Sequence, residues 1–364
     1  MERSHSQSWL FSAAQDTWVF LGSTLASIAL LILGAALGIL DGESPPWVFL
    51  LCVVAVDVAH VWSTLFRVYL DREERSRRPW LYGAVPICCL GASFTLYTLD
   101  PLWFWRGLAY LAVYHFLRQQ QGFLSLYHRR SHLPTWEKHL EQGTLLMAML
   151  YPLLYWHSHL PQPFYWIIAG DFLSGLAPRW AALAAPVSYT LLLLHLLLQL
   201  RARRSPWNGR TLLIGTTALC WQLGILVYPS DYAFTVTNVL IHGIPYALLV
   251  YRYGSNRAHA SDSLGLRPLR YGAYGVAYFL AVIWTLALLE EWLWHTLIFQ
   301  DQGSLFGPAH NSPWTHPLWP AVLATPQLTH YMLDGFVWKR KHNPTVSSLL
   351  SNAQTSNDTP VTVP

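Results

Sequence analysis

Four histidines stand out because each lies inside a long apolar stretch, where an ionisable side chain is costly to bury. They are His60, His115, His242 and His330. Ionisable residues within membrane-spanning helices usually face the protein interior and mark functional sites. Imidazoles that converge on one point can bind a transition metal such as iron, zinc or manganese through their ring nitrogens. The chemistry that these residues suggest is therefore that of a metal centre inside an apolar bundle.

Each of these histidines has a carboxylate or amide three or four residues away, on the same helix face. The pairs are Asp57 with His60, Gln119 with His115, Asn238 with His242, and Asp334 with His330. Such a partner either ligates the metal itself or orients the ligating imidazole by accepting a hydrogen bond. We therefore predict a ligand set of the four histidines with Asp57 and Asp334, supported by Gln119 and Asn238. Proton relay, substrate binding and hydrogen-bonded packing remain alternative roles for the histidines.

A polar run continues from His115 toward the basic end of the same apolar stretch. It begins at Arg118 and includes three consecutive glutamines. A cationic side chain followed by amides would line a path for protons, electrons or substrate, which makes Arg118 a further candidate. Alternatively, Arg118 extends its guanidinium along the helix to the membrane interface.

Three other histidines are weaker candidates. His128 and His132 are four residues apart and could share a metal, but the flanking arginines suit contact with lipid headgroups better. His195 lies in a leucine-rich stretch, LLLLHLLLQL, with Gln199 four residues later. Its surroundings are typical of a lipid-facing helix, so we interpret His195 as a packing residue.

A last group of polar residues falls in expected connections and helix ends, where polarity costs little. We interpret this group as a solvated rim, with an external site as the alternative. Its members are His157, His159, Asp171, Glu290, Glu291, His295, His310 and His316.

The composition indicates the elements that must position these residues. Hydrophobic residues make up 53% of the 364-residue chain and charged residues only 12%, against about 25% charged in soluble domains. About twenty apolar residues are needed to cross a bilayer as a helix. Ten such stretches are present, at 17–40, 46–68, 79–98, 102–124, 142–160, 181–200, 210–228, 232–252, 271–297 and 317–338. We predict an all-α, polytopic bundle of about ten transmembrane helices.

The placement of basic residues predicts the orientation of this bundle. Of the 23 Lys and Arg residues, all but Arg106 and Arg179 fall on one side if the helices alternate in direction, which leaves 21 on that side. Basic residues favour the cytoplasmic side, so both termini are predicted to be cytoplasmic. The four main histidines precede basic residues by 7 to 14 positions: His60 before Arg67, His115 before Arg129, His242 before Arg252 and His330 before Lys339. They could therefore share one layer in the cytoplasmic half.

The remaining sequence features define one domain and one tail. We expect residues 1–344 to form a single bundle and residues 345–364 to be a disordered cytoplasmic tail, because the tail lacks apolar periodicity. No cleavable signal peptide is evident. The four cysteines lie in apolar runs without metal-binding spacing and are expected to be buried.

The layered intramembrane histidines resemble those of the Brp/Blh type of membrane carotene dioxygenase. The resemblance lies in architecture and type of site, without an aligned motif, and implies non-haem iron acting with oxygen on an apolar molecule. Fatty-acid desaturases and hydroxylases carry several cytoplasmic HxxxH and HxxHH boxes, of which only His128 and His132 match one.

The resulting expectation is a membrane oxidoreductase of the oxygenase, hydroxylase or desaturase class. Its cofactor would be iron, mononuclear or dinuclear, with zinc or manganese as alternatives. Its partners would be a lipid-like or isoprenoid substrate, membrane lipids and an electron donor, without nucleic acid, in the plasma (inner) membrane. The alternatives are a secondary transporter with an intramembrane histidine and carboxylate site and a haem-binding electron carrier.

Overall fold

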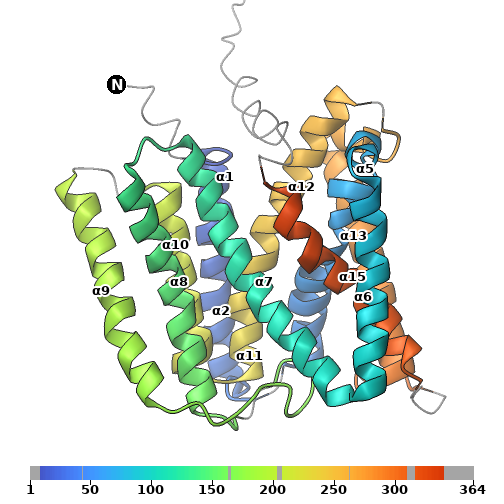
Figure 1. Ribbon diagram of the computed structural model, residues 1–364, viewed down its shortest axis with the longest axis horizontal. Coiled ribbons are helices and arrows are strands. Elements are labelled where there is room, and N and C mark those ends of the chain that lie inside the picture. The colour runs from blue at the N-terminus through green and yellow to red at the C-terminus, as the bar shows by residue number, and fades with distance from the viewer. Residues whose placement is uncertain are drawn as a thin grey trace, which may run out of the picture.

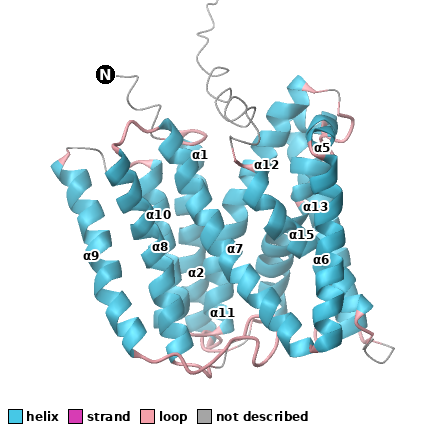
Figure 2. Cartoon of the chain, viewed as in Figure 1, coloured by secondary structure: helices cyan, strands magenta, loops and turns pink. Residues whose placement is uncertain are grey.

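The computed structural model describes residues 9–42, 44–162, 165–202, 207–261, 263–309 and 316–339. Within these ranges the ordered structure is helical and contains no β-strand, as Figure 2 shows. The predicted all-α class is therefore confirmed. The predicted tail at 345–364 lies outside the described residues, and the single bundle over 1–344 stays a prediction.

Ten long helical rods account for most of the described residues. The first two are segmented: Ala13–Leu37 consists of α1 (Ala13–Asp16), η3 (Thr17–Leu21) and α2 (Gly22–Leu37), and Pro46–Tyr69 consists of α3 (Pro46–Val48), η4 (Phe49–Val58), α4 (Ala59–Trp62) and η5 (Leu65–Tyr69). The next four are α6 (Pro79–Leu99), α7 (Pro101–Arg130), α8 (Thr135–Ser158) and α9 (Arg179–Arg201). The last four are α10 (Gly209–Trp221) with η6 (Gln222–Val227), α11 (Asp231–Phe234) with η7 (Thr235–Val239) and α12 (Leu240–Ala260), α13 (Gly272–Trp294) with η9 (His295–Phe299), and α15 (Leu318–Val337). Short helices α5 (Arg72–Arg77), η8 (Arg267–Arg270) and α14 (Gly303–Phe306) lie in the connections.

Seven of the rods in the described part of the chain are long and apolar enough to span a membrane. The other three, α7, α8 and α15, occupy predicted spans but carry more polar side chains. In α7 these include Arg118 and the three glutamines that follow it, and in α15 they include His330 and Asp334. The chain is thus a multi-pass helical membrane protein by its length and composition. The count of ten spans and the cytoplasmic location of both termini stay predictions.

The helices that carry the four histidines lie at the centre of the bundle. In Figure 1, α7 crosses obliquely between one group formed by α8, α9 and α10 and another formed by α6, α13 and α15. Pairs α8 with α9 and α6 with α15 pack along much of their length. In the most apolar 18-residue segment of the rod that contains α12, 83% of the segment is buried, whereas only 17% of the corresponding segment of α6 is buried. Peripheral helices therefore shield a central layer that can carry polar side chains.

Local sequence signals explain how the central helices begin and approach one another. The Asp100 carboxylate caps α7 by accepting a hydrogen bond of 2.8 Å from Leu102 N, and Pro101 occupies the first helical position. On α12, a Cβ atom at Gly243 would lie 2.6 Å from Val56 Cγ1 and 2.9 Å from the Val56 carbonyl oxygen. The lack of a side chain at Gly243 thus lets α12 lie directly against η4.

π-helical turns precede two of the four histidines. The ten-residue η4 ends two positions before His60, and η7 ends three positions before His242. A π turn contains an extra residue and so rotates every residue that follows it about the helix axis. The direction in which these two imidazoles point therefore depends on non-α geometry that periodicity alone does not predict.

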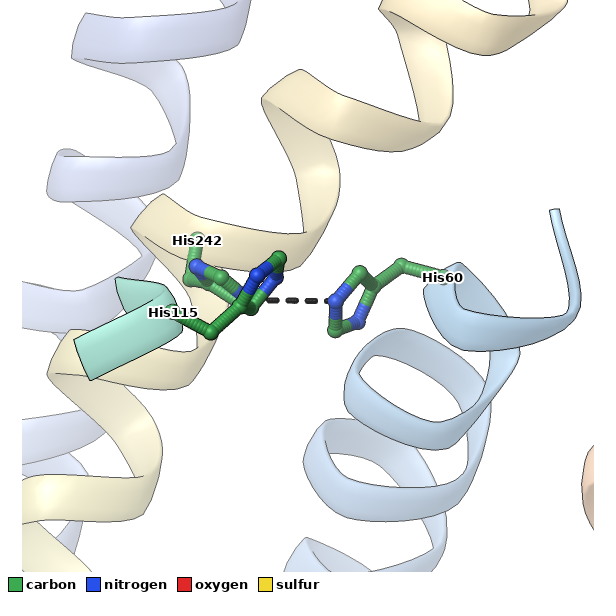
Figure 3. Close-up of side chains that lie close together, drawn as sticks. All are labelled: His60, His115 and His242. Carbon is green, nitrogen blue, oxygen red and sulfur yellow. Dashed lines mark hydrogen bonds between the residues drawn. The ribbon is translucent and has the colours of Figure 1, made fainter. Parts of the chain in front are cut away.

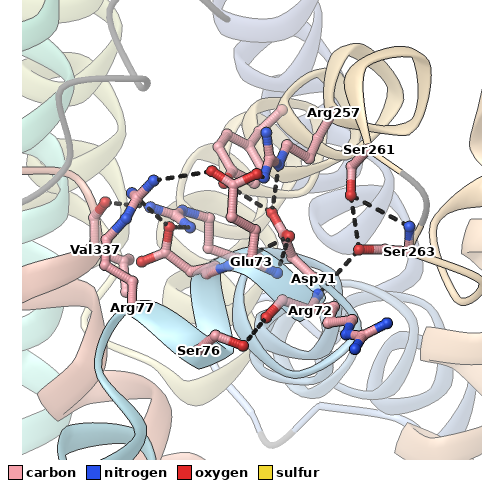
Figure 4. A network of polar contacts seen from close by, with 12 residues as sticks. Asp71, Arg72, Glu73, Ser76, Arg77, Arg257, Ser261, Ser263 and Val337 are labelled. Atoms are coloured by element: carbon pink, nitrogen blue, oxygen red, sulfur yellow. Dashed lines mark hydrogen bonds and ion pairs between the residues drawn. The ribbon is translucent and has the colours of Figure 1, made fainter.

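A network of ion pairs joins the elements at one end of the bundle, the end that carries α5 (Figure 4). Arg67 is fully buried, with Nη1 lying 3.3 Å from Glu74, and it donates to the Val337 carbonyl. Arg257 Nε lies 2.8 Å from Asp71 Oδ2. The network ties η5 and α5 to α12 and α15. We refer to this end, which also holds the C-terminus of α7, as the basic end.

Candidate metal centre

Four imidazoles from four helices meet in the interior. His60 lies on α4, His115 on α7, His242 on α12 and His330 on α15, and each side chain is at most 3% exposed. The Nε2 atoms of His60 and His242 are 3.1 Å apart, and so are those of His115 and His330. Figure 3 shows the first three of these side chains directed toward one another. The predicted histidine layer therefore converges on one point.

The rings form a four-sided arrangement. Neighbouring rings around the four sides have centroid separations of 4.6 to 5.1 Å and interplanar angles of 70° to 89°. Across one diagonal, the rings of His60 and His115 are 6.1 Å apart and nearly parallel, at 15°. A small central position is thus enclosed by ring edges on all four sides.

This geometry fits a transition metal. Two nitrogens that bind one ion at about 2.1 Å lie roughly 3.0–3.4 Å apart for bond angles between square and tetrahedral. The observed Nε2 separations of 3.1 Å fall in this range. Ring nitrogens of His60, His115 and His242 all lie within 4.8 Å of one another. The buried group of His60, His115 and His242 could therefore hold a transition-metal ion, and His330 lies beside it, with its Nε2 3.1 Å from that of His115.

The outward nitrogens of three rings face oxygen atoms. His60 Nδ1 lies 3.5 Å from Asp57 Oδ1, His115 Nδ1 lies 3.9 Å from Asp334 Oδ2, and His330 Nδ1 lies 2.7 Å from Thr64 Oγ1. Around a metal, one ring nitrogen usually faces the ion and the other an orienting acceptor. Only His330 has a hydrogen bond on its outward side, whereas the Nδ1 atoms of His60 and His242 have no hydrogen-bond partner among the described residues. The two carboxylates, predicted as ligands, thus lie behind the rings. Asp334 faces His115 from another helix, although the spacing paired it with His330.

The predicted partner Gln119 acts on the backbone of α12. Its amide donates to the His242 carbonyl oxygen at 2.7 Å. The neighbouring Gln120 amide donates to the Ile241 carbonyl at 3.1 Å. Pro245 cannot donate a backbone hydrogen bond to the carbonyl four residues earlier, which is that of Ile241. The two glutamines of α7 therefore satisfy and position the segment of α12 that carries His242.

Asn238 does not contact the histidine with which its spacing pairs it. Its side-chain amide donates to Thr237 Oγ1 at 3.1 Å. A Cβ atom at Gly224 would lie 2.1 Å from Thr237 Oγ1 and 2.7 Å from Asn238 Nδ2. Asn238 thus packs where η6 and η7 approach each other. The structure shows no hydrogen bond between Asn238 and His242 that would correspond to the predicted supporting role.

Aromatic side chains complete the shell around the imidazoles. Phe116 stacks on His242 at a centroid distance of 3.6 Å, and Tyr331 stacks on His115 at 4.5 Å. Tyr246 lies edge-on to His60 and donates a hydrogen bond of 2.8 Å to Asp334 Oδ1. Sequence reasoning missed these residues, although Tyr246 follows His242 by four residues and so shares its helix face. The shell makes the centre largely apolar.

Arg118 lines a cavity that reaches the histidine cluster. This cavity, of about 310 Å³, lies between α7, α12 and α15, and His115 forms part of its wall. We call it the lateral cavity. Arg118 is exposed, and its guanidinium donates to Gln121 Oε1 at 2.8 Å. Of the predicted polar wall below His115, Arg118 and Gln119 line this cavity, whereas the Gln120 amide donates to the backbone of α12.

The weaker histidine candidates belong to a different cluster. His128 Nε2 lies 2.7 Å from Glu141 Oε2, and His195 Nδ1 lies 3.8 Å from Glu141 Oε1. Arg210 Nε also lies 3.2 Å from this carboxylate. His128 and His195 are 8% and 2% exposed, whereas the leucines that flank His195 are 42% to 56% exposed. His195 is thus buried on a helix whose neighbouring side chains face outward, and Arg129, which follows His128, is exposed. His132 is exposed beyond the end of α7.

The predicted solvated rim is partly buried. Asp171, Glu290 and His295 are 1%, 6% and 3% exposed. Glu290 accepts a hydrogen bond of 2.7 Å from Trp62 Nε1, and His295 accepts one of 3.0 Å from Gln302 N. Burial raises the pKa of the Asp171 carboxyl, which accepts hydrogen bonds from backbone amides of its own connection. His159, His316 and part of Glu291 remain exposed, and His310 lies outside the described residues.

The rim residues enclose a second cavity, of about 210 Å³. Four carboxylates line it, those of Asp57, Glu290, Glu291 and Asp301. We call it the acidic cavity. Since Asp57 also faces His60 Nδ1, this cavity extends to the back of the histidine cluster.

Comparison of the chain with protein-family models, with curated proteins and with solved structures finds no match to any of them.

Proposed function

We propose that this protein is a membrane-embedded oxidoreductase that uses iron and oxygen to act on a lipid-like or isoprenoid substrate. The observation that carries the proposal is the convergence of four buried Nε2 atoms, in pairs 3.1 Å apart, from four helices. A separation of 3.1 Å is also the length of a hydrogen bond between two imidazoles. The metal is favoured because two such pairs lie side by side around one position, with neighbouring ring centroids 4.6 to 5.1 Å apart.

The surroundings of the rings favour a redox metal over a structural one. Imidazole nitrogens suit iron and zinc among other ions, and structural zinc sites usually contain cysteine thiolates. Here the four cysteines are free, and none lies among the residues around the imidazoles. The aromatic shell keeps water away, and a bound iron would supply the activation of oxygen. The protein residues would hold the metal, orient its ligands and exclude water from the centre.

The position of the lateral cavity supports the proposal that the substrate enters from the bilayer. Leu111, Tyr114 and Met332 line it and are 40% to 61% exposed on the outside of the bundle. An apolar molecule could thus pass sideways from lipid to the wall formed by His115. We further propose that the basic end is cytoplasmic, in the plasma (inner) membrane, where an electron donor would have access to it.

The geometry argues against the haem alternative. Two axial imidazoles of a haem stand on opposite faces of the ring with their nitrogens about 4 Å apart, and the porphyrin occupies all the space between them. At this centre the rings close all four sides at centroid distances of 4.6 to 5.1 Å. No specific contact among the described residues favours the transporter alternative.

Metal analysis of the detergent-purified protein tests the proposal. We expect one iron atom per chain and an absorption spectrum without the intense band of haem. His60→Ala and His330→Ala should each lose most of the iron, because each removes a donor from the centre. The exposed His259 on α12 provides the control, and His259→Ala should keep the wild-type content. Active wild-type protein without any transition metal would refute the proposal.

A further inference from the structure

The two cavities that reach the histidine cluster differ in the sign of their charge. The acidic cavity is lined by four carboxylates, and neither Lys nor Arg occurs among its described lining residues. The lateral cavity is lined by Arg118, Arg129 and Lys339 and by a single carboxylate, Asp334. Asp334 Oδ1 already accepts hydrogen bonds of 2.8 Å from Tyr246 and Trp338. The lateral cavity therefore attracts anions, whereas the acidic cavity repels them.

Arg118 is the cation of the lateral cavity that lies nearest the histidine cluster. It follows His115 by three residues, so the two side chains share one face of α7 about one turn apart. The hydrogen-bond partner described for its guanidinium is the neutral Gln121 amide, at 2.8 Å. A guanidinium in a membrane-spanning region is costly unless it is hydrated or paired. A carboxylate can accept two parallel hydrogen bonds from it.

A separate apolar cavity lies next to the lateral cavity along α7. It has a volume of about 250 Å³ and lies between α6, α7 and α15. Leu111 and Met332 line both cavities, so the two are adjacent there and these side chains lie between them. The lining of the apolar part includes Cys89, Ala92 and Leu108 and no charged residue among the described ones. From Arg118 back to Gly107, which also lines it, α7 rises about 16 Å.

A cationic site at one end and an apolar passage at the other match one class of molecule. We propose that the substrate is an anionic single-chain amphiphile, such as a long-chain carboxylic acid. Its charged group pairs with Arg118, and its chain extends past His115 and Leu111 into the apolar cavity. The carbons closest to the charged group then lie level with the histidine cluster. This inference rests on the proposed function, because it treats the lateral cavity as the substrate site.

Equilibrium binding of two ligands that differ only in their end group tests the pairing. Oleate and oleyl alcohol would each displace a fluorescent fatty acid from the purified, iron-loaded protein. We expect the wild type to bind oleate more tightly than the alcohol. Arg118→Gln should weaken oleate binding about tenfold, as expected for loss of a charge-assisted pair, and leave the alcohol unchanged. Arg118→Lys should restore part of the difference.

Two further variants distinguish an effect on the charged end group from an effect on the apolar chain. Arg179 is an exposed arginine at the start of α9, and Arg179→Gln should not alter the affinity for either ligand. Ala92→Phe, an exposed position on α6, places a ring in the apolar cavity. This variant should weaken oleate and oleyl alcohol alike but leave the shorter octanoate almost unaffected.

Two outcomes would overturn the inference. One is equal affinity of the wild type for acid and alcohol, and the other is oleate binding that Arg118→Gln does not change. Iron content and the elution profile in size-exclusion chromatography are measured on the same samples. Iron-containing, monodisperse protein with no Arg118 effect refutes only the anionic substrate. Wild-type protein without a transition metal refutes the proposed function, whatever it binds.

Discussion

At the scale of single residues, the candidate centre depends on which nitrogen of each imidazole is free. A neutral histidine presents a free Nε2 inward only if Nδ1 keeps the proton. Oxygens of Asp57, Asp334 and Thr64 lie on the Nδ1 side of three of the rings, and only the contact with Thr64 is a hydrogen bond. The shortest of these contacts is the one of 2.7 Å between His330 Nδ1 and Thr64 Oγ1. Replacement of such orienting groups commonly costs 10- to 100-fold in metal affinity.

Thr64→Val should therefore weaken metal binding about tenfold while the protein still folds. Valine has nearly the shape of threonine but cannot form the hydrogen bond, so His330 loses the contact that holds its ring. Competition with a chromophoric chelator measures the affinity. Thr98→Val is the matched control, since Thr98 is exposed on α6 and bonds only its own helix, to Phe94 O. Equal metal affinity in both variants and the wild type would contradict this role for Thr64.

Residue types and spacing were sufficient to select the histidines but not all of their partners. Equal depth identified His60, His115, His242 and His330, because depth follows from position along a helix. The i, i+4 rule paired Asp334 with His330, whereas the carboxylate faces His115 on another helix. Contacts between helices depend on how each helix is rotated, which spacing within one helix cannot give. Thr64 and Tyr246 escaped notice because neither is unusual in an apolar stretch.

At the scale of helices, the separation between α12 and η4 sets the distance between two of the donors. The backbones touch at Gly243 and Val56, next to His242 and four residues before His60. Helices in membranes commonly approach through small residues, because lipid provides no hydrophobic force to drive them together.

Gly243→Ala should destabilise the protein by about 1–3 kcal/mol, the usual cost of inserting a methyl group into a packed interface. Its Cβ would lie 2.6 Å from Val56 Cγ1 and 2.9 Å from the Val56 carbonyl oxygen, so α12 must shift. Thermal unfolding and iron content should both decrease. At Gly215 on α10 an added Cβ atom would meet no neighbouring atom within 4 Å, and Gly215→Ala should be neutral. Unchanged iron content in Gly243→Ala would contradict the close approach.

The sequence predicted the number and order of the long helices better than their apolarity and their π-helical turns. The ten apolar stretches match ten rods, yet only seven of these meet a strict criterion of apolarity. Hydropathy undervalues α7 and α15, because several of their polar side chains, such as Gln119, Gln120 and His330, are buried between helices. The π-helical turns of η4 and η7 were not predicted either, since neither the apolar sequence of η4 nor the Thr- and Asn-containing sequence of η7 distinguishes a π turn from an α turn.

At the scale of the whole molecule, the distribution of basic residues gives the bundle two different ends. The network around Arg67 and Arg257 closes one end, and the connection 159–178 lies at the other. Positive charge is retained on the cytoplasmic side during insertion.

Reporter fusions should reveal this orientation directly. A reporter fused after Lys341 should be cytoplasmic, and one inserted near Gly303 should be external, because α15 separates the two points. Alkaline phosphatase and green fluorescent protein, which are active on opposite sides of the membrane, provide the paired measurement. The same location at both points would rule out a membrane crossing by α15 and with it the ten-helix topology.

The histidine quartet also connects parts of the chain that are distant in sequence. Successive donors are separated by 55, 127 and 88 residues, from the positions 60, 115, 242 and 330. An ion held by all four would act as a cross-link that closes three long loops at once. Closing loops of this length removes much conformational entropy from the unfolded chain, and binding that requires the folded bundle stabilises it. The supply of metal during biogenesis would then control how much of the protein reaches a stable fold, quite apart from any catalysis.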